Sequence, residues 1–367
     1  MARRRSNRQR ALFALVTAVI VLDLGEVLAR LYPPPDPRAP ATGGGDFSVL
    51  LHGSPWLLWE IQPGDRVENG NSVHVNELGF RGATPGPKSR PRAMSLGDSS
   101  IYGYGVKDDE VFTSVLGDKF DADFINGGVP GYSSFQSLNL LDMRGLALEP
   151  DLLLVGNLWS DNNFDTFVDR DLLATYAGWQ GSTGWRVRTA LSHSALFRWV
   201  DFAVRVGPQG TQARKVGWQL GSGEPGSGTR RVAVNDYAAN LDGFCDRMRM
   251  LGGGVVFVVL PSREDIDPLS AGPGWEVYRN VMRETAKRHN VPVVEAPEAF
   301  KASGHTADDL FLDLMHPTPL GHALLADTVA ASLTAAGWPA TPLRVSPPSS
   351  ERPVYTDRMA GRTGGAE

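Results

Sequence analysis

The chain has 367 residues, 42% of them hydrophobic and 21% charged, so it can bury a sizeable core in one large domain or two. Its formal net charge is −5, and five arginines fall in the first ten residues, so the rest is more acidic than the whole. An acidic body excludes a nucleic-acid-binding role, because phosphate contacts need a basic face. The single cysteine, Cys245, excludes an intrachain disulfide.

The N-terminal segment predicts a membrane helix. An apolar run over 11–22 follows the arginines, and a weaker apolar stretch continues past Asp23 and Glu26. Together they reach the length of about 20 residues that crosses a bilayer. We interpret residues 1–32 as an uncleaved signal anchor. The alternatives are a cleaved signal peptide, with 39–41 as the candidate cleavage site, or an ordinary helix. The arginines predict a cytoplasmic N-terminus and a body outside the cytoplasm.

Residues 33–91 predict a linker and a lead-in segment. The stretch 33–45, PPPDPRAPATGGG, is stiffened by its prolines and ends in flexible glycines, as linkers do. The segments 56–59 and 74–81 predict a hairpin or strand that packs on the domain that follows.

From Arg92 onward, short apolar runs alternate with amphipathic stretches of helical length. Solidly apolar strands are buried on both faces, so this alternation predicts an α/β domain over 92–337, a three-layer α/β/α sandwich with a parallel five-stranded sheet. Right-handed crossovers bring the carboxyl ends of all strands to one edge. The expected strands are 93–96, 123–126, 152–156, 255–260 and 291–294. The expected helices lie near 110–120, 134–148, 234–251, 275–288 and 320–335.

Two segments depart from this alternation. Residues 164–231 predict an insertion with helices at 169–176 and 185–206, either a lid over the carboxyl edge of the sheet or a decorating subdomain. The tail, 338–367, is rich in Pro, Ser and Gly with little apolar content, which predicts disorder.

A candidate nucleophile follows the first strand of the domain, in the triplet Gly97-Asp98-Ser99. A strand that ends in a turn of small residues exposes a side chain at the sheet edge where α/β folds place their chemistry. Asp313 and His316 stand just before the last predicted helix. A histidine that takes a proton from a serine needs a carboxylate on its other nitrogen. Each motif alone also suits an ordinary turn, and the combination favours nucleophilic catalysis.

Acyl transfer also needs hydrogen-bond donors for the oxyanion that develops. The segment 126–133 follows the second strand, and its glycines allow backbone N–H groups to approach a ligand closely. The third strand leads into Asn157, Ser160 and Asn162. No zinc-ligand spacing and no P-loop occurs, so we expect no metal and no cofactor.

Together these blocks resemble the SGNH/GDSL esterase and lipase family, over roughly 76–335. The resemblance implies a flavodoxin-like SGNH hydrolase fold with Ser99 as nucleophile. It also implies Asp313 and His316 as the other triad members, and backbone oxyanion donors at Ser99 and Gly131. The segment Asn76–Arg81 is similar to a lead-in of membrane-anchored bacterial members. This similarity implies a single-pass protein of the bacterial inner membrane with a periplasmic catalytic domain.

The chain departs from the family at the oxyanion asparagine, where Ser160 stands. Three interpretations follow: Ser160 donates instead, Asn157 or Asn162 reaches the oxyanion from nearby, or the site is weakened and serves binding. Losing a side-chain donor of this kind costs about 2.7–4 kcal/mol of transition-state stabilisation.

The expected function is that of a serine esterase acting on acetyl esters, in O-deacetylation of a cell-envelope or exported polysaccharide. The alternatives are a lipid esterase or thioesterase, an acyltransferase, and a catalytically weak binding or assembly protein with the same fold. The expected partners are an acylated small molecule or polysaccharide and the inner membrane, with no nucleic acid. Trp159, Trp179 and Trp185 are candidates for stacking on sugars.

Overall fold

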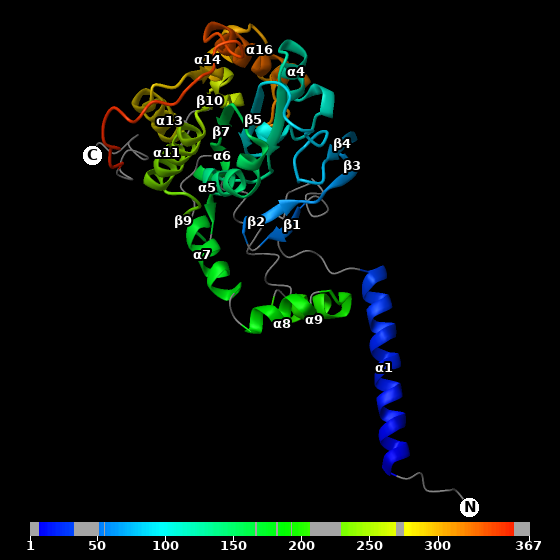
Figure 1. Cartoon of the computed structure of the whole chain (residues 1–367). Coiled ribbons are helices and arrows are strands. Elements are labelled where there is room, and N and C mark those ends of the chain that lie inside the picture. The colour runs from blue at the N-terminus through cyan, green and yellow to red at the C-terminus, as the bar shows by residue number, and fades with distance from the viewer. Residues whose placement is uncertain are drawn as a thin grey trace, which may run out of the picture.

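A computed structural model describes residues 7–32, 51–54, 56–165, 167–180, 183–191, 193–205, 229–268 and 275–355. Its centre is a sheet of five parallel strands in the order β6, β5, β7, β10, β11 (Figure 1). The strands are β5 Arg92–Gly97, β6 Asp123–Gly128, β7 Leu152–Gly156, β10 Gly254–Val259 and β11 Val293–Glu295. The predicted five-stranded parallel sheet is confirmed. The strand order reverses between β5 and β7, and open α/β sheets bind ligands at such a switch point.

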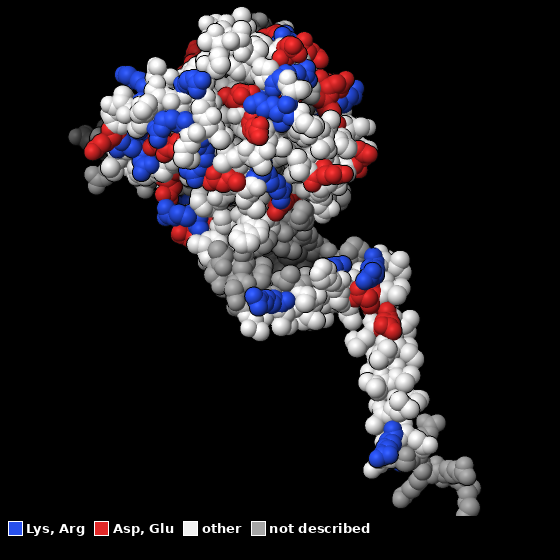
Figure 2. Space-filling model, viewed as in Figure 1, with Lys and Arg blue, Asp and Glu red and all other residues white. Residues whose placement is uncertain are grey.

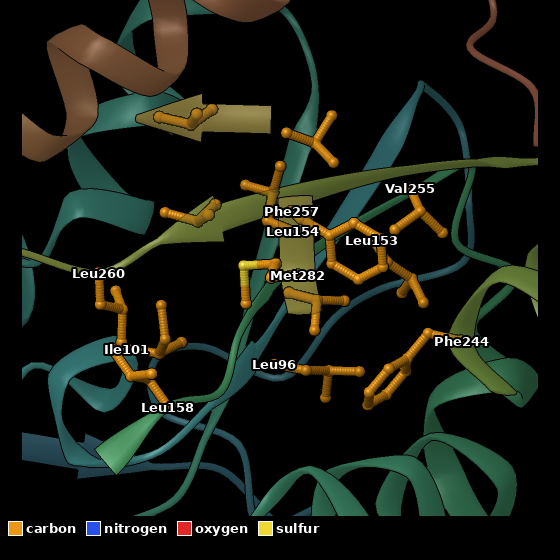
Figure 3. Packing of buried hydrophobic residues seen from close by; sticks show 14 of the residues in the cluster. Leu96, Ile101, Leu153, Leu154, Leu158, Phe244, Val255, Phe257, Leu260 and Met282 are labelled. Carbon is orange, nitrogen blue, oxygen red and sulfur yellow. The ribbon is translucent and has the colours of Figure 1, made fainter. Parts of the chain in front are cut away.

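Helices cover both faces of this sheet (Figure 1). On one face pack α5 (Ser134–Leu140), α11 (Val234–Leu251) and α13 (Glu276–His289). On the other pack α4 (Phe112–Lys119), α14 (Ala296–Ala302) and α16 (Pro319–Ala335). Figure 3 shows side chains of the strands meeting Phe244 of α11 and Met282 of α13. Burial on both faces explains why β7 and β10 are continuously apolar, whereas β5 and β6 also contain polar residues such as Ser95 and Asn126.

Short turns of helix complete the domain. They are α3 (Ser99–Tyr102), α6 (Trp159–Asn162), α12 (Arg263–Ile266), α15 (Ala307–Leu310) and a 3₁₀ turn at Asp108–Glu110. The helix expected over 134–148 changes after α5 into a π turn, Leu141–Gly145, and a 3₁₀ turn, Leu146–Leu148. A Cβ at Gly145 would lie 2.8 Å from the Leu141 side chain and 3.0 Å from the Met94 sulfur. Glycine therefore lets this wide turn lie against β5.

The lead-in segment forms two antiparallel hairpins, where one hairpin or strand was expected. β1 (Leu51–Ser54) pairs with β2 (Leu58–Ile61), and β3 (Gly64–Glu68) pairs with β4 (Asn71–Val75). The predicted linker, 33–45, lies outside the described residues.

The insertion leaves and re-enters the domain through a short antiparallel pair, β8 (Phe164–Asp165) with β9 (Thr229–Arg230). It contains three described helices where two were expected: α7 (Asp169–Gln180), α8 (Thr183–Leu191) and α9 (Ala195–Arg205). Helices α8 and α9 lie apart from the sheet, and α9 packs against the N-terminal helix, so these two helices do not cover the sheet edge as a lid (Figure 1).

The N-terminal helix α1 (Asn7–Leu31) projects from the domain (Figure 1). It is the one helix among the described residues that is long and apolar enough to cross a membrane, and its apolar window is fully exposed. Figure 2 shows charged side chains near its two ends and none along the stretch between them. A membrane anchor and a signal sequence both have these properties.

The C-terminal segment differs from the expected disorder. Trp338 packs edge-on against Phe120 and Phe124, with ring centroids 5.5 and 5.6 Å apart. Tyr355 is also buried, and its backbone N–H and its hydroxyl both donate hydrogen bonds to the domain. The prediction of a disordered tail is therefore wrong as far as Tyr355, because a few buried aromatic rings hold a segment whose average composition is polar. Residues 356–367 lie outside the description.

Candidate active site

The turn after β5 carries the candidate nucleophile. Asp98 caps the N-terminus of α3, since its side chain accepts a hydrogen bond from the Ser100 N–H at 3.0 Å. Its other carboxylate oxygen accepts from the Trp159 N–H at 3.1 Å. Burial raises the pKa of Asp98 to about 6, although these hydrogen bonds and the His316 charge oppose the shift. Asp98 thus ties the Ser99 turn to the segment that follows β7.

The structure brings Ser99, His316 and Asp313 together. The Ser99 Oγ lies 2.7 Å from Nε2 of His316, and Nδ1 of the same ring lies 2.6 Å from Oδ2 of Asp313. The other carboxylate oxygen of Asp313 accepts the backbone N–H groups of Met315 and His316, at 2.9 Å each. These contacts fix the carboxylate on the imidazole. The arrangement can deprotonate a serine hydroxyl and stabilise the imidazolium that results.

Electrostatics keeps Asp313 ionised. Burial disfavours its charged form, but the hydrogen bond and charge of His316, with the two backbone donors, outweigh burial and lower the pKa of Asp313 to about 2. An ionised carboxylate on Nδ1 favours the tautomer whose free Nε2 faces the serine.

Two contacts hold the nucleophile turn in register with its neighbours. The Ser100 hydroxyl donates to the carbonyl of Met315 at 3.0 Å, which joins the serine turn to the histidine loop. Arg81, buried at the end of the lead-in segment, donates to the carbonyls of Tyr102, Gly103 and Val106. One guanidinium therefore satisfies three carbonyls of the glycine-rich turn after Ser99.

The glycine loop after β6 approaches from the other side. Gly131 adopts a φ of +79°, and a Cβ there would lie 3.1 Å from the ring of Trp59, so the position favours glycine on both counts. Trp59 donates from its indole to the Pro130 carbonyl at 3.1 Å, and its own carbonyl accepts from the Tyr132 hydroxyl at 2.6 Å. Within the described residues, the backbone N–H groups of Ser99 and Gly131 have no protein acceptor.

Arg231, at the end of the insertion, anchors the same loop. It donates to the Gly131 carbonyl at 2.8 Å and to the Gln136 side chain at 2.7 Å. It also forms a two-pronged ion pair with Asp169, at 2.9 and 2.7 Å, and Ser133 donates to that carboxylate at 2.6 Å. Both charged side chains are almost fully buried, so the pair is a fixed element of the loop.

The segment after β7 holds the three candidates for a further oxyanion donor. The Asn157 amide donates to Ser137 Oγ at 2.9 Å, and the Asn162 oxygen accepts from Arg230 at 2.7 Å. The Asn157 amide therefore already donates elsewhere, whereas the contact of Asn162 uses only its oxygen and not its amide N–H groups. Ser160 is buried in the first turn of α6, and its backbone N–H hydrogen-bonds to Asp98, which caps the nucleophile turn.

Asp161, next to Ser160, is a buried carboxyl of unusual affinity for protons. Its oxygens accept from the N–H and the hydroxyl of Ser134. Burial raises its pKa to about 8 with a contribution from Asp169, although the Ser134 hydrogen bonds oppose the rise. The carboxyl is therefore largely protonated at neutral pH.

Asp161→Asn is expected to flatten the pH dependence of stability. Because the folded state raises this pKa from 3.8 to about 8, the folded protein keeps a proton that the unfolded chain releases. The free energy of unfolding of the wild type therefore falls as pH rises through this window, by up to about 1.4 kcal/mol per pH unit. Urea denaturation of the full chain in detergent across that range would show the fall in the wild type and its loss in the variant.

The matched control is Asp121→Asn, at a side chain that is 95% exposed. It should leave the pH slope of the wild type intact. A slope that is the same in Asp161→Asn and in the wild type would contradict the raised pKa.

The structure also bears on the tryptophans proposed to stack on sugars and on metal binding. Trp159 is buried edge-on against Trp275, with centroids 5.0 Å apart, so it does not offer a face for stacking on sugars. The side chains of Trp179 and Trp185 lie outside the description. Among the described residues, no cluster of His, Cys, Asp and Glu could hold a metal ion.

Solved structures of other proteins resemble this chain in fold, at low sequence identity. No family model and no curated protein matches the chain. LAE5, an alpha/beta hydrolase enzyme from the metagenome of Lake Arreo, Spain, has a TM-score of 0.43 at 17% identity, covering 67% of this chain and 95% of LAE5. Axe2, an acetylxylan esterase from Geobacillus stearothermophilus, has 0.43 at 13%, covering 67% and 95%. TesA has 0.42 at 14%, covering 66% and 98%. At these identities the similarity describes the arrangement of strands and helices alone.

Sequence reasoning missed the groups that hold the site in place. Arg231 and Asp169 have no local motif, because they lie 62 residues apart and Gly131 lies 100 residues from Arg231. Arg81 belongs to the segment 76–81, which the sequence analysis singled out, but its burial and its role in holding the turn after Ser99 became visible only in the structure.

Proposed function

We propose that the chain is a serine esterase that acts by acyl transfer through Ser99. The observation that carries the proposal is the hydrogen-bonded series Ser99–His316–Asp313, with contacts of 2.7 and 2.6 Å. His316 accepts the proton of Ser99 as the oxygen attacks the ester carbonyl, and then gives that proton to the leaving alcohol. Water, deprotonated by the same imidazole, adds to the acyl-enzyme and releases the acid.

The N–H groups of Ser99 and Gly131 are the proposed backbone donors to the oxyanion, and Ser160 is the proposed side-chain donor. Ser160 is favoured because it stands where the SGNH family has its oxyanion asparagine. Asn157 is disfavoured because its amide already donates to Ser137. Asn162 is the second candidate, since its contact with Arg230 uses only its oxygen. Its backbone contact with Asp98 also supports a position beside the nucleophile turn.

The proposed substrates are acetyl esters of a cell-envelope or exported polysaccharide, with the domain outside the cytoplasm and α1 as an uncleaved anchor in the bacterial inner membrane. The basic N-terminus supports this orientation, and the length and exposure of α1 support the anchor. A capping contact from α1 to α9, through Glu26, also supports retention of α1 in the mature protein, since cleavage would remove it.

Ser99→Ala is the variant that tests the proposal. A fluorophosphonate should add one phosphonyl group to the wild type and none to the variant, as measured by intact mass. The wild type should also release acetate from 4-nitrophenyl acetate, with turnover lost in the variant.

Ser114→Ala, at an exposed serine on α4, is the matched control and should behave as the wild type. Labelling that persists in Ser99→Ala would overturn the assignment. Labelling without turnover would point to an acyltransferase.

Ser160→Ala is expected to lower kcat for 4-nitrophenyl acetate by about 10²-fold and to leave KM nearly unchanged, since an oxyanion donor acts on the transition state. Steady-state kinetics of the wild type, of Ser160→Ala and of Ser160→Thr would measure the change in kcat and KM. Ser160→Thr keeps the hydroxyl and should retain most of kcat. A wild-type kcat in Ser160→Ala would place the donor elsewhere.

A further inference from the structure

We propose that α8 and α9 form a membrane-binding platform, lying flat in the lipid headgroup region on the outer side of the bilayer. The inference rests on the anchoring role proposed for α1. The occupant of the platform surface is the bilayer itself, including its anionic lipids.

Helix α9 is attached to α1 by polar contacts. The Glu26 carboxylate accepts hydrogen bonds from the Ser194 hydroxyl at 2.7 Å and from the N–H groups of Ala195 and Leu196 at 2.9 Å each. A residue of α1 therefore caps the N-terminus of α9 and satisfies donors that the helix leaves unpaired. The Trp199 indole adds a hydrogen bond to the Tyr32 carbonyl at 2.6 Å.

The position of these contacts along α1 determines how deep α9 lies in the bilayer. A helix of 25 residues is about 37 Å long, whereas the hydrocarbon core is about 30 Å thick. The excess of about 7 Å is little more than one helical turn. The charged Glu26 places it at the C-terminal end of α1, while the long side chains of Arg8 and Arg10 reach the opposite interface from within the helix. The residues that contact α9 lie in and just beyond this end, and α8 and α9 run transverse to α1 (Figure 1). Both helices thus lie along the membrane surface while the domain stands beyond them.

The exposed residues of the platform suit a lipid interface. Val187, Leu191 and Val200 are about half exposed, at 52%, 46% and 52%. Arg186 and Arg198 are also exposed on α8 and α9, with Arg198 on the side of α9 opposite Val200, and their long basic side chains attract anionic headgroups. Apolar and basic side chains on one surface helix, with tryptophan at the boundary, characterise helices that lie in the membrane plane.

This apolar surface continues into α1. A Cβ at Gly25 would lie 3.2 Å from the Leu196 side chain, so α9 rests directly on α1 there. Val200 follows Leu196 by one turn on the same face of α9. Continuity with the exposed apolar side chains of α1 favours the bilayer as the occupant over a protein partner.

Fluorescence quenching by brominated lipid tests the platform in the full chain. An environment-sensitive fluorophore would be attached to Val200→Cys, Val187→Cys, Ile20→Cys or Val354→Cys, in vesicles of phosphatidylcholine and phosphatidylglycerol. Cys245 is fully buried, so the native thiol stays unlabelled. Bromine would be placed either near the headgroup or near the end of the acyl chain.

We expect labels at Val200 and Val187 to be quenched more strongly by bromine near the headgroup. The label at Ile20 should be quenched more strongly by bromine near the chain end, and the label at Val354, on the domain surface, by neither. Quenching at Ile20 without quenching at Val200 and Val187 would overturn the platform and leave the anchor standing. Loss of quenching at all these sites would refute both. If the emission of the label at Val200 changed only at a high ratio of protein to lipid, and lipid bromine did not quench it, that face of α9 would contact a second copy of the chain. This result would overturn the proposal.

Discussion

His316→Ala is expected to lower kcat/KM for 4-nitrophenyl acetate by about 10⁶-fold, close to the loss from removing the whole triad. The imidazole contacts the Ser99 hydroxyl at 2.7 Å, and alanine leaves that hydroxyl with no base. Fluorophosphonate labelling should become correspondingly slow, because the reagent also needs an activated serine. Steady-state kinetics and the time course of labelling measure the two effects.

The chain offers a matched control at His74, which pairs with Asp65 on the surface as His316 pairs with Asp313. His74→Ala removes a histidine–carboxylate pair whose side chains, among the described residues, make no hydrogen bond to a serine, so turnover should match the wild type. If both substitutions lowered turnover equally, the loss would reflect the fold, and the role proposed for His316 would be wrong.

Arg231→Met is expected to lower the free energy of unfolding by about 3–5 kcal/mol, because it leaves the buried Asp169 carboxylate without its partner. It should also lower kcat more than it changes KM, since the guanidinium holds the carbonyl of Gly131, whose N–H is a proposed oxyanion donor. Urea denaturation and steady-state kinetics of the full chain in detergent would measure both effects.

Arg247→Met is the control, because Arg247 pairs with Asp142 at the surface and such pairs contribute about 0–1 kcal/mol. The double variant Asp169→Leu with Arg231→Met should recover part of the stability, because no buried charge remains unpaired. It should not recover kcat, since the Gly131 contact is still missing. Recovery of both would show that Arg231 acts on stability alone.

The sheet was predictable because its strands are buried on both faces. A strand such as β7 is apolar at every position from Leu152 to Val155, and no tertiary information is needed to recognise it. The candidate triad was equally accessible, since Gly97-Asp98-Ser99 and Asp313–His316 are local patterns at the ends of elements. Its assigned roles remain predictions, although the three side chains meet as expected.

Other features depend on partners distant in sequence. The single helix expected over 185–206 is two helices, and the second begins where Glu26 of α1 caps Ala195 and Leu196. Ser194 is a local signal for the start of the second helix, since its hydroxyl accepts from the Phe197 N–H, but nothing near the break indicates the contact with Glu26. The glycine loop after β6 likewise has its glycines close together in the sequence, but the arginine that fixes the loop comes from the far end of an insertion.

The separation of the serine from its base has a consequence for biogenesis. Ser99 and His316 lie 217 residues apart, and the Ser100–Met315 contact closes the same interval. In the proposed orientation, the anchor enters the membrane first and the histidine emerges among the last parts of the domain. A partly exported chain holds its serine without a proton acceptor, so the proposed hydrolysis would begin only once the whole domain has crossed the membrane and folded on the far side.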